Sequence, residues 1–151
     1  MELKKKLIST YLILFSLSVV FANEWFNSAN EILKNNKEPQ VEYWLNFVIQ
    51  NTKGNYKSEF GTRVYEYKNF KIQEFLFNDD GAGSKSNIKS HSYEIQFSDG
   101  NNISLYITKE EIILIFFDNL KKERYRIILT STEIEYIYGG KGSEYRFKVI
   151  K

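Results

Sequence analysis

After residue 22, two stretches of the chain have apolar residues at positions that would share one side of a helix. The first stripe comprises Trp25, Phe26, Ala29, Ile32 and Leu33, and the second comprises Val41, Trp44, Leu45, Val48 and Ile49. Both follow the spacing of three and four residues that a helix with 3.6 residues per turn requires. Pro39 suits the first turn of the second helix, because its missing N–H leaves no hydrogen bond unmade there. The pattern predicts two amphipathic helices within about residues 24–52.

From about residue 60 to residue 151 the hydrophobic period shifts to two, which indicates half-buried strands. In the clearest example, His91, Tyr93, Ile95 and Phe97 alternate with Ser92, Glu94, Gln96 and Ser98. Further alternations occupy 103–108, 124–129, 133–138 and 145–150, and less regular ones occupy 63–67 and 70–77. Turn-forming residues separate these runs, and the polar, glycine-bearing stretch 79–87 indicates a loop. We expect about eight strands with short links, which favours an antiparallel meander.

Residues 112–117 (IILIFF) are apolar on both faces. Such a strand needs cover on both sides, and at a sheet edge it would promote aggregation. We therefore expect it near the centre, between the helices and the interior of a strongly curved sheet. The predicted fold is α+β, with two N-terminal amphipathic helices packed on a curved antiparallel β-meander or open barrel of about eight strands. The sequence does not decide between a closed barrel and an open sheet, because closure depends on pairing of the first and last strands.

Residues 1–22 have the features of a secretory signal peptide. Three lysines precede an apolar run over 7–21, and Val20 and Ala22 supply small residues before a cut. The run is shorter than the roughly 20 residues of a membrane-spanning helix, and it contains four Ser or Thr residues. Cleavage after Ala22 is therefore favoured over a retained membrane anchor. We expect a single mature α+β domain over 23–151, exported to the periplasm or the extracellular medium.

Export changes the charge balance. The whole chain has 21 Lys and Arg and 19 Asp and Glu, and removing the signal takes away three lysines and one glutamate, which leaves 18 of each sign. A neutral domain has no overall electrostatic attraction to nucleic acid or to acidic membranes. We expect no nucleic-acid binding and no stable membrane insertion after signal cleavage. The abundance of Ile, Lys, Asn, Phe and Tyr beside three alanines is typical of A/T-rich codons and favours a bacterial source.

Residue types that commonly carry catalysis are scarce. The chain has no cysteine, which excludes disulfides, thiolate zinc sites and a cysteine nucleophile, and its one histidine, His91, excludes a two-histidine metal site. We interpret His91 as a structural residue. The loop 79–87 begins with two aspartates but lacks the late glutamate of a calcium loop. Adjacent Glu110 and Glu111 would point to opposite faces of a strand. The sequence thus predicts no catalytic residue, no metal site and no cofactor.

The densest basic cluster behind residue 22 comprises Lys121, Lys122, Arg124 and Arg126. Arg124 and Arg126 share a face of one predicted strand. The next predicted strand carries Glu133 and Glu135 on one face. We therefore expect cross-strand ion pairs between these arginines and glutamates rather than an anion-binding site.

Tyrosine is the most unusual feature, with ten copies behind residue 22. Tyrosine suits strands, but its flat apolar ring and polar hydroxyl also suit recognition surfaces. Tyr136 and Tyr138 share a strand face, and Tyr145 follows across a glycine-rich turn. Tyr106 projects on the face opposite Ile103 and its alternating apolar neighbours. We predict that Tyr136, Tyr138, Tyr145 and Tyr106 bind a ligand or partner.

The leading functional hypothesis is an exported, non-enzymatic binding protein. It would recognise a protein partner, as an inhibitor or an immunity-type protein does, or a small apolar ligand. One alternative is a hydrolase that cleaves an envelope polymer with paired carboxylates. A further alternative is a structural or adhesive surface component that associates with itself through a sheet edge.

Overall fold

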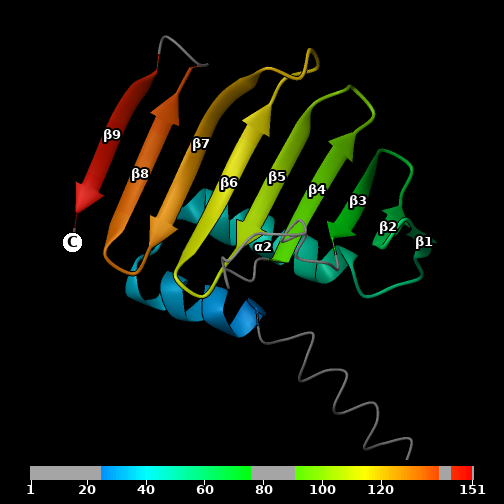
Figure 1. Ribbon diagram of the computed structural model, residues 1–151, viewed down its shortest axis with the longest axis horizontal. Helices are drawn as coiled ribbons and strands as arrows, with labels where there is room; N and C mark the ends of the chain where they lie inside the picture. The colour runs from blue at the N-terminus through cyan, green and yellow to red at the C-terminus, as the bar shows by residue number, and fades with distance from the viewer. Residues whose placement is uncertain (1–24, 76–90, 140–143, 151) are drawn as a thin grey trace, which may run out of the picture.

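The structure, a computed structural model, describes residues 25–75, 91–139 and 144–150. These ranges contain a helix over 25–35, helix α2 (Pro39–Asn51) and nine strands (Figure 1). The strands are β1 (Lys57–Glu59), β2 (Thr62–Glu66), β3 (Phe70–Phe75), β4 (His91–Phe97), β5 (Asn102–Ile107), β6 (Glu111–Phe117), β7 (Glu123–Thr130), β8 (Glu133–Tyr138) and β9 (Tyr145–Ile150). Each strand pairs antiparallel with the next, in the order of the chain.

The sheet is open, because β1 and β9 are its two edges and do not pair with each other. This confirms the predicted α+β meander behind two helices, and it decides the point that the sequence left open. The described residues form nine strands rather than about eight. The additional strand, β1, has three exposed residues, so no alternation of burial marks it in the sequence.

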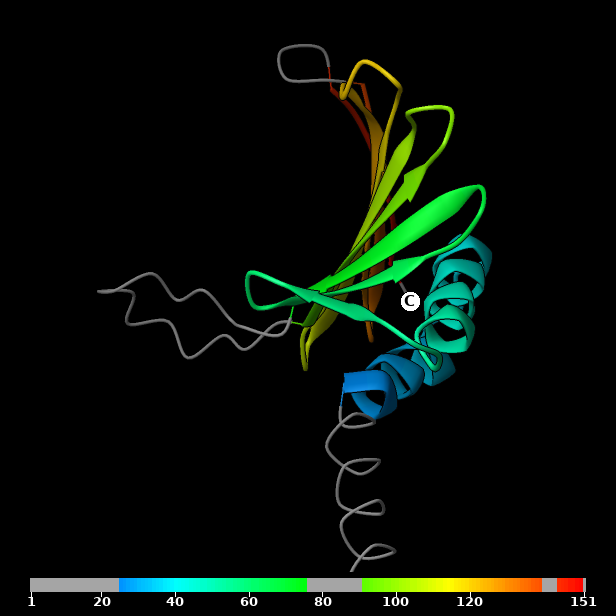
Figure 2. The ribbon, with the colours of Figure 1, turned by 90° about the vertical axis from the view of Figure 1, so that its right-hand side faces the viewer.

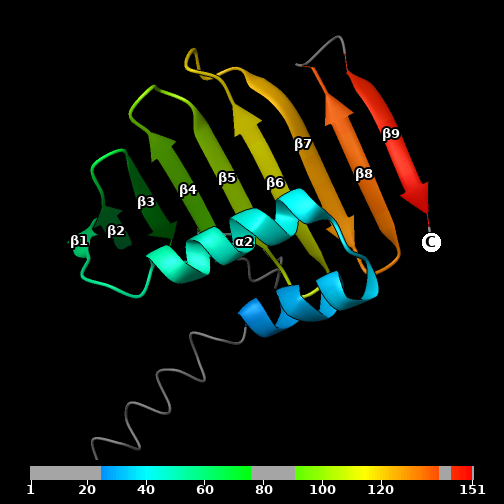
Figure 3. The ribbon, with the colours of Figure 1, turned by 180° about the vertical axis from the view of Figure 1, so that it is seen from behind.

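Both helices lie on one face of the sheet, which we call the helix face (Figure 2). At one end, the Asn36 side chain donates a 3.3 Å hydrogen bond to the carbonyl of Thr130 in β7. At the other end, the Tyr67 hydroxyl, just behind β2, donates a 2.7 Å hydrogen bond to the carbonyl of Asn51. Helix α2 therefore crosses the strands rather than running along them (Figure 3).

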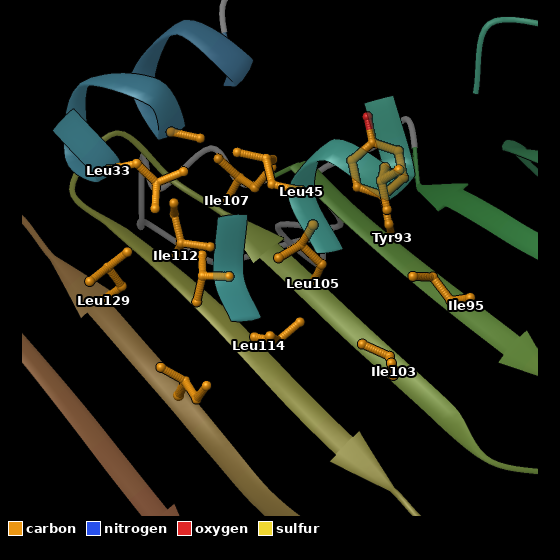
Figure 4. Close-up of a cluster of buried hydrophobic side chains, with 14 of the residues drawn as sticks. Leu33, Leu45, Tyr93, Ile95, Ile103, Leu105, Ile107, Ile112, Leu114 and Leu129 are labelled. Carbon is orange, nitrogen blue, oxygen red and sulfur yellow. The ribbon is translucent and has the colours of Figure 1, made fainter. Parts of the chain in front are cut away.

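Alternate strand residues face the helices and form the core (Figure 4). Leu105, Leu114 and Ile127 are direct neighbours across β5, β6 and β7, and each is fully buried. The helices contribute the buried side chains of Ala29, Ile32, Leu33, Val41, Leu45 and Val48. These residues belong to the stripes that helical spacing predicts, so the amphipathic pattern identifies the packed sides of both helices correctly.

Helix α2 begins at a buried carboxylate. Glu38 is only 3% exposed, and its Oε2 accepts a 2.8 Å hydrogen bond from the backbone N–H of Val41. Its Oε1 accepts a 3.1 Å hydrogen bond from the hydroxyl of Tyr136 in β8. A carboxylate at a helix N-terminus also stabilises the positive end of the helix dipole. Glu38 thus links the start of α2 to the sheet. The next residue, Pro39, lies in the first turn of the helix, as predicted.

The other face of the sheet, the open face, carries none of the described elements (Figure 2). Strand β6 is central, as expected, and its second side belongs to this open face. Ile113 and Phe117 remain half-buried there, and Ile115 is 9% exposed. In the register, Arg126 stands between Ile115 and Ile137. Stems of long side chains can shield such apolar neighbours.

This asymmetry predicts unequal effects of two neighbouring substitutions in β6. Leu114→Ala should lower the free energy of unfolding by about 2–5 kcal/mol, because it leaves a cavity beneath the helices. Ile113→Ala, on the open face, should cost less than half as much, since solvent can fill the space. Urea denaturation followed by circular dichroism measures both values. Equal losses would contradict a core confined to the helix face.

Candidate functional site

Strand β9 lies outside the span of both helices (Figure 3). Helix α2 has 13 residues, which gives a length of about 20 Å. Nine strands spaced at about 4.8 Å make a sheet roughly 38 Å wide. The helices are therefore too short to cover the whole helix face, and all six residues of β9 are exposed.

Three rows of side chains cross the helix face and end on β9. In register order from β6, the rows are Phe116, Tyr125, Tyr138 and Tyr145; Leu114, Ile127, Tyr136 and Phe147; and Ile112, Leu129, Ile134 and Val149. Their last members are 73%, 56% and 43% exposed, respectively. Each row thus continues a covered part of the sheet into solvent. We call Tyr138, Tyr145, Phe147 and Val149 the edge patch.

The structure brings three of the four predicted tyrosines together. Tyr138 lies directly opposite Tyr145, and Tyr136 lies opposite Phe147 with ring centroids 6.3 Å apart. Tyr136 is half-buried, and burial with the nearby Glu38 carboxylate raises its pKa to about 12. Its hydroxyl therefore stays a hydrogen-bond donor, and Tyr136 supports the patch from beneath.

Tyr106, the fourth predicted tyrosine, is separate from this group. It lies on the open face, opposite Ser92 on one side and Ile113 on the other, and it is 38% exposed. The sequence correctly placed Tyr106 on the face opposite Ile103. It did not show that this face lies on the far side of the sheet from Tyr138 and Tyr145.

In the first of the three rows, three aromatic rings are stacked. The Phe116 and Tyr125 centroids are 4.1 Å apart with the rings 17° from parallel, and the Tyr125 and Tyr138 centroids are 5.6 Å apart. The Tyr125 hydroxyl donates a 2.7 Å hydrogen bond to Gln40 Oε1 in α2. Helix α2 thus holds the middle ring of the stack, and Tyr145 follows opposite Tyr138 as the exposed end of the row.

On the open face of β9, two cations pair with carboxylates. Arg146 contacts Glu144 at 2.9 Å and Glu135 at 3.4 Å, and Lys148 contacts Glu133 at 2.8 Å. The two glutamates of β8 therefore pair with β9, and the expected pairs with Arg124 and Arg126 are wrong.

The register of β7 explains this difference. Ile128, not an arginine, lies opposite Glu135, and Ile137 lies opposite Arg126. Arg126 instead binds Glu123 within its own strand through two hydrogen bonds of 2.6 and 2.7 Å. The irregular register beside Phe117 leaves Arg124 to pair with Asp118 at 2.6 Å.

A buried polar cluster surrounds Glu74 near the opposite end of the sheet. Glu74 Oε1 lies 2.9 Å from His91 Nε2, and Glu74 Oε2 accepts a 3.0 Å hydrogen bond from the Tyr65 hydroxyl. The Tyr93 hydroxyl donates to Oε1 at 3.4 Å. The imidazole of His91 also stacks against Trp25 of the first helix, with centroids 6.3 Å apart. Glu74 thus links β2, β3 and β4 beneath the start of that helix.

The electrostatics of this cluster favour a fixed charge. Burial raises the pKa of Glu74, but the hydrogen bonds and positive charge of His91, with smaller contributions from Tyr65 and Arg63, bring the pKa below its usual range. Burial and the Glu74 charge raise the pKa of Tyr65 to about 12 and raise the pKa of Tyr93 as well. Both hydroxyls therefore remain donors to an ionised carboxylate. These contacts fit the interpretation of His91 as a structural residue.

Among the described residues, no group of three or more His, Asp or Glu side chains could hold a metal ion. No helix in the described ranges is long and apolar enough to cross a membrane. The predicted signal peptide 1–22 and the whole of the predicted loop 79–87 lie outside the described residues. No family model, curated protein or solved structure matches this chain.

The Glu74 cluster predicts a pH-dependent contribution to stability. Because the folded pKa lies below the ordinary value of 4.5, the contribution is present above about pH 4.5 and is lost as the pH falls through the folded pKa. Glu74→Gln should lower the free energy of unfolding at pH 7 by about 1–3 kcal/mol, because it leaves buried donors poorly paired. The difference between wild type and variant should shrink between pH 5 and pH 3 in urea denaturation.

Glu59→Gln is the matched control, since Glu59 is an exposed carboxylate in β1. It should change the stability by less than about 0.5 kcal/mol at every pH. A gap between wild type and Glu74→Gln that stays constant down to pH 3 would show that Glu74 carries no depressed pKa.

Proposed function

We propose that the protein is an exported binding module that accepts an extended segment of a partner protein along β9. The observation that carries this proposal is that the three rows of mainly apolar side chains on the helix face end at exposed residues of the edge strand β9. Exposed apolar patches with a polar surround commonly mark interaction sites, and a free sheet edge can bind a peptide as an additional strand. Export rests on the residue pattern of 1–22.

The backbone of β9 has free hydrogen-bonding groups on its outer side. The Gly139 N–H donates a hydrogen bond to the carbonyl of Arg124, its opposite residue in the β7–β8 register. This bond shows which residues of β8 direct their backbone groups towards β7. Because the groups of successive residues point to opposite sides, alternate β8 residues, including Tyr138, bond towards β9. Their partners in β9 are Tyr145, Phe147 and Val149. The backbone groups of Arg146, Lys148 and Ile150 therefore point outwards, where an added strand would bond.

The side chains of β9 specify the sequence pattern of such a segment. An added strand would continue the three rows on the helix face with apolar residues, and an aromatic residue beside Tyr145 would lengthen the aromatic row. On the open face it would lie next to Arg146 and Lys148, where opposite charges are favoured. The expected partner segment thus alternates apolar residues with acidic or neutral polar ones.

A second copy of this chain fits the edge less well. The symmetric antiparallel register that pairs residues 144–150 of the two copies is centred on Phe147. That register places Arg146 directly opposite Lys148 of the copy, and like charges in this position are destabilising. Basic residues on an edge strand protect natural sheets against self-association. These charges favour a different protein as the partner over the adhesive alternative.

The remaining alternatives have weaker support. Three surface hollows of about 380, 520 and 590 Å³ are lined mainly by polar side chains, which suits a small apolar ligand poorly. The largest contains the carboxylates of Glu31 and Glu110, so it is the place where an envelope-polymer hydrolase would be tested. Both side chains are exposed, whereas the acid of such an enzyme is typically desolvated.

Two substitutions at one position test strand addition. Lys148→Ala and Lys148→Pro both remove the ion pair with Glu133, but only proline removes the outward N–H. Heptapeptides selected from a random phage library on the wild-type protein should show the alternating pattern and should bind Lys148→Ala within about fivefold of wild type. Lys148→Pro should weaken the same peptides by at least about 30-fold. Fluorescence anisotropy with synthetic peptides measures both affinities.

Amide hydrogen exchange locates the contact. Bound peptide should protect the amides of Arg146, Lys148 and Ile150 and leave those of β1 unchanged. Peptides that bind Lys148→Pro as well as wild type, or that protect amides elsewhere, would overturn the proposal. Selection without an alternating pattern would do the same.

The edge patch predicts a second difference, between two exposed tyrosines. Tyr145→Ser should weaken the binding of the selected peptides about tenfold or more, because it removes the exposed last ring of the aromatic row. Tyr106→Ser removes a ring that is 38% exposed on the open face and should leave the affinity unchanged. Equal effects of the two substitutions would show that the edge patch is not the contact surface.

A further inference from the structure

The open face carries a polar hollow of about 520 Å³ that is separate from β9. It lies between the turn joining β4 to β5 and the turn joining β6 to β7. Its strand residues include Glu94, Gln96, Asn102, Ser104 and Phe117, and Asn119 adds a side chain from the second turn. The volume falls within the range of about 300–1,000 Å³ that is usual for small-molecule sites.

Several polar groups in this hollow are not used by the protein. Within the described ranges, the carboxamides of Asn102 and Asn119 and the hydroxyl of Ser104 form no hydrogen bond with the protein. Asn102 and Ser104 are half-buried and line the hollow. Gln96 Nε2 donates a 2.8 Å hydrogen bond to Glu94 Oε1, which leaves the second carboxylate oxygen available. The hollow thus presents both donors and acceptors.

The two turns that form its wall are held in place by other residues. A Cβ atom added to Gly100 would lie 3.1 Å from Asn119 Cβ, so the turns approach each other closely. Gly100 has a φ of +92°, which other residues rarely adopt. In the second turn, Asp118 Oδ1 accepts hydrogen bonds from the N–H groups of Leu120 and Lys122, both at 2.9 Å. Other groups therefore hold the two turns in place, and the carboxamides of Asn102 and Asn119 are not needed for that purpose.

This set of groups matches a saccharide. Carboxamides and carboxylates can donate to or accept from neighbouring hydroxyl groups of a sugar, and the half-buried ring of Phe117 offers an apolar surface to its C–H groups. An apolar ligand would leave the amides unpaired, which is costly. A strongly anionic ligand would meet Glu94, and Lys121 is the cation in the lining. We propose that this hollow binds one or two units of a saccharide that is neutral or carries a single carboxylate per unit.

Nuclear magnetic resonance titration of the mature protein tests this proposal with four probes: maltotriose, cellotriose, chitotriose and trigalacturonic acid. At least one probe should shift the side-chain amide signals of Gln96, Asn102 and Asn119 in a saturable way. Asn102→Ala and Asn119→Ala should each weaken that probe about tenfold. Gln73→Ala is the matched control, because Gln73 lies on the same face of the neighbouring strand β3 but outside the hollow. It should leave the affinity unchanged.

Lys121→Ala distinguishes the two kinds of saccharide. A loss of affinity confined to trigalacturonic acid supports recognition of a carboxylate, and retained affinity for a neutral probe supports recognition of hydroxyl groups alone. The proposal is overturned if none of the four probes saturates below 20 mM. It is also overturned if the shifts map to β9 or the helices, or if Gln73→Ala weakens binding as much as Asn102→Ala. Because the hollow and β9 are separate, either site can fail its test without affecting the other.

Discussion

The structure depends on a mismatch between a wide sheet and two short helices. One face of the sheet is apolar almost from edge to edge, and burial of that face is the main source of stability. The helices can cover only part of it, because α2 is about half as long as the sheet is wide. Their position therefore decides which apolar side chains become core and which remain at the surface.

Two polar anchors fix that position. Glu38 binds the start of α2 and the Tyr136 hydroxyl of β8. Near the other end of the helical layer, Glu74 holds His91, against which Trp25 stacks. Buried polar groups of this kind are costly unless they are paired, so each anchor favours one placement of its helix. With the helices fixed between β2 and β8, the edge strands β1 and β9 are left without cover, and of the two only β9 carries apolar side chains.

The two faces of the sheet consequently present different chemistry. At β9 the helix face is uncovered, and aromatic and apolar side chains there meet a free backbone edge. The open face instead carries amides, hydroxyls and paired charges, with isoleucines shielded between them. A peptide strand suits the first environment because it can satisfy backbone groups and continue the rows. A polyhydroxylated ligand suits the second, because it can satisfy side-chain amides.

The sequence by itself determined the elements and the face of each residue. Helical spacing identified the buried stripes, and the alternation over β4 to β9 placed Tyr136, Tyr138 and Tyr145 on one face and Tyr106 on the other face of its strand. These are local properties, set by the 3.6-residue and two-residue periods. Even the central place of residues 112–117 followed from their lack of a polar side.

Only the tertiary structure decided which residues of different strands and helices are neighbours. Alternation shows which side of a strand is apolar, but it does not show how far a helix reaches, so the exposure of Phe147 and Val149 could not be predicted. The partners of Glu133 and Glu135 depended on the registers of β8 with its two neighbours, which place Ile128 opposite Glu135 and bring Arg146 and Lys148 within reach of the two glutamates. Openness of the sheet likewise depended on β1 and β9 remaining apart. These features arise from contacts between distant segments, and no local pattern of residues encodes them.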